Sequence, residues 1–205
     1  MTINTLIIAI TAIISFLSFS NRDLFAKLEY NPWLCYHRKQ WYRMISHALI
    51  HADLFHLLVN MFVLWSFGRI VEAWFGNLFG IKGIWFYLLL YVGGVLFASL
   101  PGLRKHRDNP AYNAVGASGA VSAVLFAAIL LQPLSEIRLF LIPFGIPAFI
   151  FGPLYLFYEV YMDKRSSDRI AHDAHYYGAV FGLLFCVLLE PRIFINFLNQ
   201  IVKWL

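Results

Sequence analysis

The stretch 115-VGASGAVSA-123 decides the fold of this chain, and within it Ser118 is flanked by glycine and alanine. The stretch opens an apolar run that continues to Leu131, which makes the segment too hydrophobic for the surface of a soluble protein. Among the eight residues that follow Val115 in this stretch, only Val121 has a side chain that is not small. A helix that is small on every side can be approached closely by other membrane helices from every side. We therefore expect this helix at the centre of a membrane bundle.

Composition supports a membrane protein. The chain has 205 residues, of which 60% are hydrophobic and only 13% are charged, against about 25% charged residues in soluble domains. The mean hydropathy is +0.68, and several apolar runs are long enough to cross a bilayer. These features predict an all-α, polytopic membrane protein that forms a single domain over residues 1–205. The net charge of +5 is spread over short loops, which favours anchoring at the lipid interface over binding of nucleic acid.

Six membrane spans are predicted, which places both termini on one side of the membrane. They cover about residues 5–19, 53–74, 83–100, 115–131, 139–158 and 174–189. Asp53 is a suitable N-cap for the second span, and Pro101-Gly102 is expected to end the third. Residues 21–45 form a long connector in which basic and aromatic residues are interleaved, a composition typical of segments at the membrane surface.

Two features of these spans allow more than one interpretation. The fifth span contains Pro143, Pro147 and Pro153, which predicts either a kinked structural helix or a mobile gate. Arg69 and Glu72, three residues apart near the end of the second span, are expected to form an ordinary surface pair.

Small residues indicate where the fourth and sixth spans meet. Two stripes have a spacing of four residues: Gly119, Ala123 and Ala127 in the fourth span, and Ala174, Gly178, Gly182 and Cys186 in the sixth. Such stripes bring helix backbones together. Because Ser118 and His175 each lie one position from a stripe, both are predicted near one helix–helix seam. The 14 residues from Ser118 to Leu131 span roughly 21 Å, less than a core of about 30 Å, which suggests a buried, water-filled pocket at Ser118.

The polar residues in the spans suggest acyl transfer. A serine hydroxyl becomes a good nucleophile when a neutral imidazole accepts its proton, and His175 is placed to do so. The oxyanion of the intermediate needs preorganised hydrogen-bond donors. The backbone N–H of Ser118 can supply one, and His56 and Asn60, which share a helix face at i,i+4, can supply others. Gly116 keeps the approach to the serine open. No metal site or cofactor is needed for this chemistry.

With these motifs in order, the chain resembles the rhomboid family of intramembrane serine proteases over nearly all six spans. The matching elements are Arg43, His47-Ala48-Leu49-Ile50-His51, His56-x-x-x-Asn60, Gly68-x-x-x-Glu72-x-x-x-Gly76, Gly116-Ala117-Ser118-Gly119 and Ala174-His175-x-x-Gly178-x-x-x-Gly182. The resemblance implies Ser118 as nucleophile and His175 as base, with His56 and Asn60 at the oxyanion. It implies cleavage of peptide bonds in or next to transmembrane segments of membrane-protein substrates, and location in the cell (inner) membrane.

Two departures from the family pattern concern the surroundings of His175. The family often has a tyrosine one turn after the nucleophile, where it stacks on the catalytic histidine; here that position is Ser122. Ala171-His172 also repeats the Ala-His pair three residues before Ala174-His175, but the spacing to Gly178 and Gly182 favours His175. Because the family uses a serine–histidine dyad, no acidic third member is expected.

Membrane orientation and three rival functions stay open. Eleven of the 16 Lys and Arg residues lie on the side that would carry the active site, and the positive-inside rule places that side in the cytoplasm, against the outward-facing family arrangement. The first rival is a catalytically inactive relative that binds membrane proteins. The second is a di-iron oxidoreductase using His47-x-x-x-His51 and His172-x-x-His175. The third is a transporter, although no internal repeat is visible.

Overall fold

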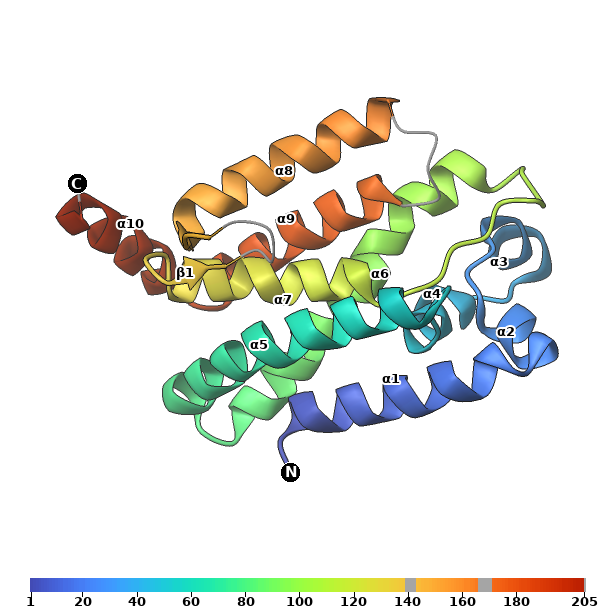
Figure 1. Ribbon diagram of the computed structural model, residues 1–205, viewed down its shortest axis with the longest axis horizontal. Coiled ribbons are helices and arrows are strands. Elements are labelled where there is room, and N and C mark those ends of the chain that lie inside the picture. The colour runs from blue at the N-terminus through green and yellow to red at the C-terminus, as the bar shows by residue number, and fades with distance from the viewer. Residues whose placement is uncertain (139–142, 166–170, 205) are drawn as a thin grey trace.

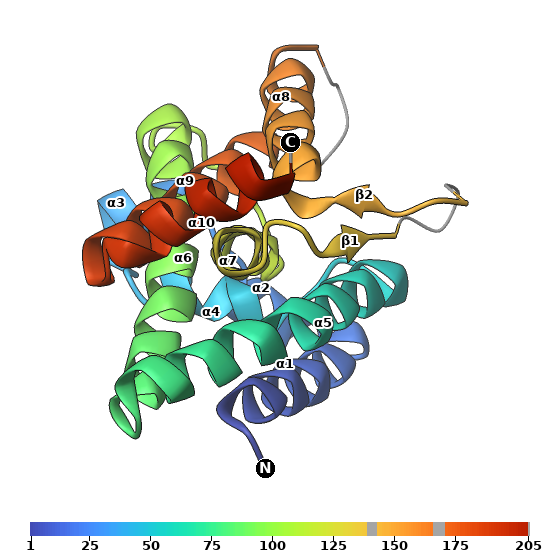
Figure 2. The same cartoon turned by 90° about the vertical axis from the view of Figure 1, so that its left-hand side faces the viewer.

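The computed structural model describes residues 1–138, 143–165 and 171–204, and it shows a bundle built around one central helix (Figures 1 and 2). The long helices are α1 (Ile3–Phe19), α5 (Leu54–Phe79), α6 (Lys82–His106), α7 (Ser118–Leu131), α8 (Ala148–Arg165) and α9 (His172–Leu189). The connector folds as α2 (Arg22–Leu28), α3 (Pro32–Arg38), α4 (Arg43–Ser46) and the short 3-10 helix η1 (His47–Leu49). A two-stranded hairpin of β1 (Glu136–Ile137) and β2 (Ile146–Pro147) precedes α8, and α10 (Arg192–Trp204) ends the described chain.

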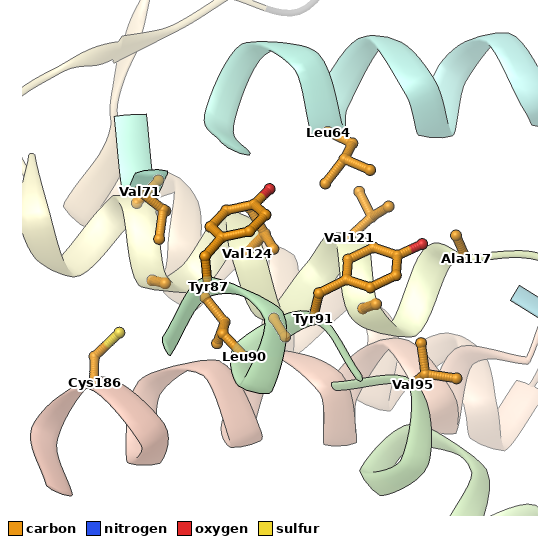
Figure 3. Packing of buried hydrophobic residues seen from close by; sticks show 14 of the residues in the cluster. Leu64, Val71, Tyr87, Leu90, Tyr91, Val95, Ala117, Val121, Val124 and Cys186 are labelled. Carbon is orange, nitrogen blue, oxygen red and sulfur yellow. The ribbon is translucent and has the colours of Figure 1, made fainter. Parts of the chain in front are cut away.

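The central helix is α7, as its small residues predicted. Every residue from Gly119 to Leu131 is buried, and Figure 2 shows α7 end-on with α5, α6, α8 and α9 around it. Its most extensive packing is with α9, followed by α6 and α5. In Figure 3 the side chains of α5, α6, α7 and α9 meet in one cluster that includes Leu64, Tyr87, Val124 and Cys186. The nucleophile candidate therefore stands at the start of the most enclosed helix.

The bundle presents apolar side chains on its outside. On α5 the exposed large apolar residues include Phe55, Leu58, Phe62 and Trp65, an arrangement that suits lipid as the surrounding solvent. Within the described residues, three helices (α5, α6 and α9) are long and apolar enough to cross a membrane, while α1 and α7 are apolar but shorter. The prediction of a helical, polytopic membrane bundle is confirmed.

Local signals explain where several helices begin. Asp53 caps α5, since its side chain accepts a hydrogen bond from the backbone N–H of His56, as predicted. Thr2 caps α1 and Asn31 caps α3 in the same way. The N-terminus of α1 is also held by Glu72, whose Oε1 accepts from the N–H of Ile3 at 2.7 Å.

Glu72 therefore does not act as expected. Instead of pairing with Arg69 on the surface it caps α1, while the Arg69 guanidinium lies 4.1 Å from the centre of the Trp65 ring. Among the described residues the structure shows no Arg69–Glu72 ion pair. The i,i+3 spacing places both residues on one helix face but cannot reveal that the chain's first helix packs there.

The predicted end of the third span at Pro101 is also wrong, because α6 continues through Pro101 to His106. Proline removes one backbone hydrogen bond, but this end of α6 is held by the connector. The Tyr30 hydroxyl donates to the Ser99 carbonyl at 2.7 Å, and Gly102 lies so close to the Tyr30 ring that an added Cβ would be 3.2 Å from it. Tertiary packing outweighs the local helix-breaking signal.

The ends of the fifth and sixth spans differ from the prediction as well. Residues 139–142, where the fifth span was expected to start, lie outside the described residues. Pro143 and Pro147 precede α8, which begins at Ala148, so only Pro153 is inside this helix. The helix then continues to Arg165, which places Glu159 within it. The sixth span begins at His172, two residues earlier than predicted.

Candidate active site

The predicted seam between α7 and α9 is present. A Cβ added to Gly178 would overlap the carbonyl oxygen of Gly119, and one added to Gly182 would overlap that of Ala123. The backbones of the two helices are therefore in direct contact along both stripes. Where α7 and α9 begin, a Cβ on Gly119 would lie 3.4 Å from the carbonyl oxygen of Ala174. The residues next to these two positions are Ser118 and His175.

Ser118 is the first residue of α7, and no described side chain caps this helix. The N–H groups of a helix's first turn have no partner inside the helix, and the helix dipole adds positive potential there. A helix start of this kind favours binding of a developing negative charge.

Gly116 approaches His56 more closely than any residue with a side chain could. Its φ is +113°, in the region that favours glycine, and an added Cβ would be 2.6 Å from Cε1 of His56. The backbone N–H of Gly116 donates to the carbonyl oxygen of His47 at 3.0 Å. The glycine expected to keep the site open thus also lets the His56 ring lie against the loop before Ser118.

The two residues expected to bind the oxyanion lie on the first turns of α5. The His56 ring packs edge-on against His51, with centroids 4.9 Å apart. Asn60 is buried, and its side-chain amide donates to the carbonyl oxygen of His56 at 2.9 Å. An amide nitrogen carries two hydrogens, so this bond leaves a second one for another acceptor.

A cavity of about 40 Å³ lies beside Ser118. Its walls come from the loop before α7, the first turn of α7, α6 and the start of α9, and they include Tyr30, His47, Ser99 and Ser118. A volume of roughly 10–15 Å³ on this scale holds one water molecule. The pocket predicted next to Ser118 is present, and its polar edge is formed by His47, whose Nε2 lies 3.0 Å from the Ser99 hydroxyl.

His51 supports the loop that leads into Ser118. It is fully buried, its Nδ1 lies 3.0 Å from the Ser15 hydroxyl, and its Nε2 accepts a hydrogen bond from the backbone N–H of Ala117 at 3.4 Å. Since Ser15 donates to the Leu49 carbonyl, its oxygen is left to accept from the Nδ1–H of His51. The acceptor role of Nε2 requires a neutral imidazole.

Burial lowers the pKa of His51 to about 3, helped by the nearby charge of His56, and burial lowers the pKa of His47 to about 4. In the unfolded chain a histidine titrates near 6.5, so between pH 6.5 and 4 the unfolded state binds more protons than the folded one. Stability is therefore complete above pH 6.5 and is expected to fall as the pH drops below it, by up to about 1.4 kcal/mol per pH unit for each group. Thermal unfolding in detergent between pH 7.5 and 4 measures this. The His51→Gln variant should show a shallower fall, and an equally steep fall would contradict the assignment.

Sequence reasoning missed Glu159. Its side chain, on α8, is 4% exposed, and its carboxylate contacts two histidines of α9: Oε2 is 2.6 Å from Nδ1 of His172, and Oε1 is 3.2 Å from Nδ1 of His175. The expected end of the fifth span at about Tyr158 left Glu159 just outside the span. The signal that could have found it is the sequence itself, since an acidic residue following a long apolar run is a functional candidate when the helix continues.

Among the described residues, Glu159, His172 and His175 form a group that could hold a metal ion. One ligand atom from each lies within 4.8 Å of the other two. Two histidines and a glutamate are a donor set that zinc accepts. The His47 and His51 pair proposed for a di-iron site is instead bonded to Ser99 and Ser15. The part of the chain that the structure describes therefore offers one such group, which does not fit a two-iron centre.

The fold and this site define a class: a polytopic helical membrane protein in which Ser118 and His175 lie next to the close contact between α7 and α9. The model of the rhomboid domain matches residues 38–192, and the chain belongs to the rhomboid family. It is 30% identical over 152 residues to "RHOMBOID-like protein 12, mitochondrial" of Arabidopsis thaliana, a match that covers 66% of this chain and 43% of that protein.

Two further relatives are named as proteases. The chain is 29% identical over 143 residues to "Rhomboid protease GlpG" of Haemophilus influenzae, covering 70% of this chain and 67% of the relative. It is 31% identical over 106 residues to "Rhomboid protease GluP" of Bacillus subtilis, covering 52% and 18%. The matches to the Arabidopsis proteins span about half the length of those relatives. The family therefore includes proteases.

Proposed function

We propose that this chain is an intramembrane serine endopeptidase that cleaves peptide bonds in or next to transmembrane segments of membrane proteins. The observation that carries the proposal is the α7–α9 seam, where the backbones of Gly119 and Ala174 adjoin and Ser118 and His175 are their direct neighbours. The proposal gains support from the two relatives named rhomboid proteases. It also covers the whole of residues 1–205 as one domain, since α1 packs on α5 and α10 on α7 and α9.

The chemical steps follow from the positions of these groups. His175 takes the proton of the Ser118 hydroxyl as its oxygen attacks the scissile carbonyl carbon, and then gives that proton to the leaving amine. The oxyanion is held by backbone N–H groups at the start of α7, with the Asn60 amide and His56 beside them. Removing one such donor costs about 10²–10³ in kcat in a soluble serine protease. Water in the cavity beside Ser118 then attacks the acyl-enzyme and releases the second product.

The site is built for a substrate that arrives from the bilayer. Ser118 is half-buried at the start of a helix that is buried from Gly119 to Leu131, so we infer that the peptide bond reaches it between helices. The substrate segment enters laterally, unwinds locally and presents its carbonyl group to Ser118. This is chemistry on membrane proteins and lipid-embedded helices, and it requires no nucleic acid, cofactor or metal.

We propose the cell (inner) membrane as the location, and two of the relatives are bacterial. The names of other relatives include mitochondrial and chloroplastic locations, so membrane fractionation of the source cell tests this assignment. A reporter fused after the described end of α10 gives the orientation, for which the basic residues and the family arrangement predict opposite results.

Labelling with a fluorophosphonate probe tests the proposed activity. The probe forms a covalent bond from the Ser118 oxygen to phosphorus and releases fluoride, which requires an activated serine but no knowledge of the substrate. We expect labelling of the folded wild-type protein at Ser118 and a loss of at least about 10³-fold in the His175→Ala variant, as when the base of a serine protease is removed. Absence of labelling in folded wild-type protein would instead favour the catalytically inactive, protein-binding alternative.

A further inference from the structure

Glu159 is a buried carboxylate with a specific arrangement around it. Taking an isolated carboxylate out of water costs so much free energy that buried ones are paired or hydrogen-bonded. Here one oxygen faces His172 at 2.6 Å and the other faces His175 at 3.2 Å. The carboxylate belongs to α8 and both histidines belong to α9, so this contact joins α8 to α9. Neither helix carries the serine, which lies on α7.

The atom of His175 that faces Glu159 matters for its chemistry. A carboxylate accepts hydrogen bonds, so the facing Nδ1 carries the hydrogen and Nε2 is left as the acceptor. Only an imidazole in this tautomer can take a proton from a serine through Nε2. A negative charge next to Nδ1 also stabilises the imidazolium that forms when the proton is taken.

Further contacts hold the carboxylate in place. His172 is buried and its short contact uses the second oxygen of Glu159. Tyr155, one helical turn before Glu159 on the same face of α8, interacts with the carboxylate, and its hydroxyl lies 3.0 Å from the hydroxyl of Ser122. Ser122 is one turn after Ser118 on α7. The contacts thus run from α7 through α8 to α9 and end at His175.

We propose that Glu159 is a positioning residue that fixes the tautomer and orientation of His175, so that the site works as a serine–histidine–glutamate arrangement. The proposal rests on the proposed protease function, because it assigns Glu159 a role only through the base. It replaces the expectation of a dyad without an acidic member. It also explains why the site tolerates Ser122, since α8 supplies the support for the imidazole.

The test compares Glu159→Gln with Glu159→Asp in the full-length protein, purified in detergent and treated with EDTA. The measured quantity is the rate of fluorophosphonate labelling at Ser118 as a function of pH. Glutamine keeps the shape but presents an amide that no longer selects the Nδ1–H tautomer, so we expect a fall of about 10²-fold or more; the corresponding Asp→Asn change in a soluble serine protease costs about 10⁴. Aspartate keeps the charge and should restore labelling to within about tenfold of wild type.

The pH profile separates positioning from a merely structural role. Loss of the carboxylate makes the imidazolium less stable, so the acid limb of the profile should move to lower pH in Glu159→Gln and stay near the wild-type position in Glu159→Asp. An unchanged rate and an unchanged profile in a folded Glu159→Gln variant would overturn this proposal alone. Absence of labelling in the wild type would overturn the protease function and this proposal together.

A second measurement needs no variant at Glu159 to fold. In wild-type protein labelled with ¹⁵N-histidine, the ring nitrogen shifts of His175, assigned by comparison with His175→Gln, should show the hydrogen on Nδ1. A hydrogen on Nε2 would overturn the proposal. Labelling that is lost with EDTA and restored by zinc would also overturn it, because Glu159 would then hold a metal ion and not the imidazole.

Discussion

Replacing Ser118 with alanine is expected to abolish cleavage of a transmembrane reporter substrate, a loss of at least about 10³-fold, because it removes the proposed nucleophilic oxygen. The fold should survive, since alanine matches the small residues on either side and the helix needs no side-chain cap at this position. The measurement is the amount of cleaved reporter after co-expression or in proteoliposomes, together with the thermal unfolding temperature of the purified variant.

The matched control is Ser135→Ala, which removes a hydroxyl that donates to the carbonyl oxygen of Gln132 near the hairpin, at the far end of α7 from Ser118. It should leave cleavage unchanged. Cleavage by Ser118→Ala at the wild-type rate would mean that the seam between α7 and α9 is a packing feature without a nucleophile.

Adding one methyl group at Gly182 should have the largest effect on stability. A Cβ at this position overlaps the backbone carbonyl of Ala123, and backbone cannot turn aside as a side chain can. We expect Gly182→Ala to lower the free energy of unfolding by about 3 kcal/mol or more, at the upper end of overpacking effects, or to prevent folding. Thermal or denaturant unfolding in detergent measures it.

Gly76→Ala provides the same chemical change in a different place. Nothing lies within 4 Å of a Cβ added at Gly76, which is inside α5. Here alanine should be neutral or stabilise the helix by about 0.5–1 kcal/mol, because glycine is a poor helix former. If both variants unfolded alike, close backbone contact between α7 and α9 could not be what holds the bundle together.

Much of the fold could be predicted because small residues and apolar runs act over short distances. The stripe of Gly119 and Ala123 and the stripe of Gly178 and Gly182 have a simple spacing, and the structure places them in contact. The Asp53 cap was visible for the same reason. The Asp53 cap and its backbone partner are only three residues apart. The two stripes lie in different helices, but each forms a surface that fits closely only against another surface of small residues.

The failures concern residues whose partners lie far along the chain. Pro101 does not end α6 because Tyr30, about 70 residues earlier, binds that part of the helix. Glu72 caps α1 from 69 residues away. Glu159 was not recognised because the helix was expected to end before it, and its histidine partners follow 13 and 16 residues later in another helix. The amphipathic α10, with Leu198 and Val202 exposed, was not expected at all.

The closeness of α7 and α9 also determines when the molecule can become complete during synthesis. During synthesis, α7 is complete about 40 residues before α9 begins. Until α9 has been made, the Gly119–Ala123 surface of α7 lacks the helix that packs on it. Because His175 lies on α9, the proposed site needs this last long helix. A chain truncated or stalled before α9 would contain every earlier helix and still lack the proposed base.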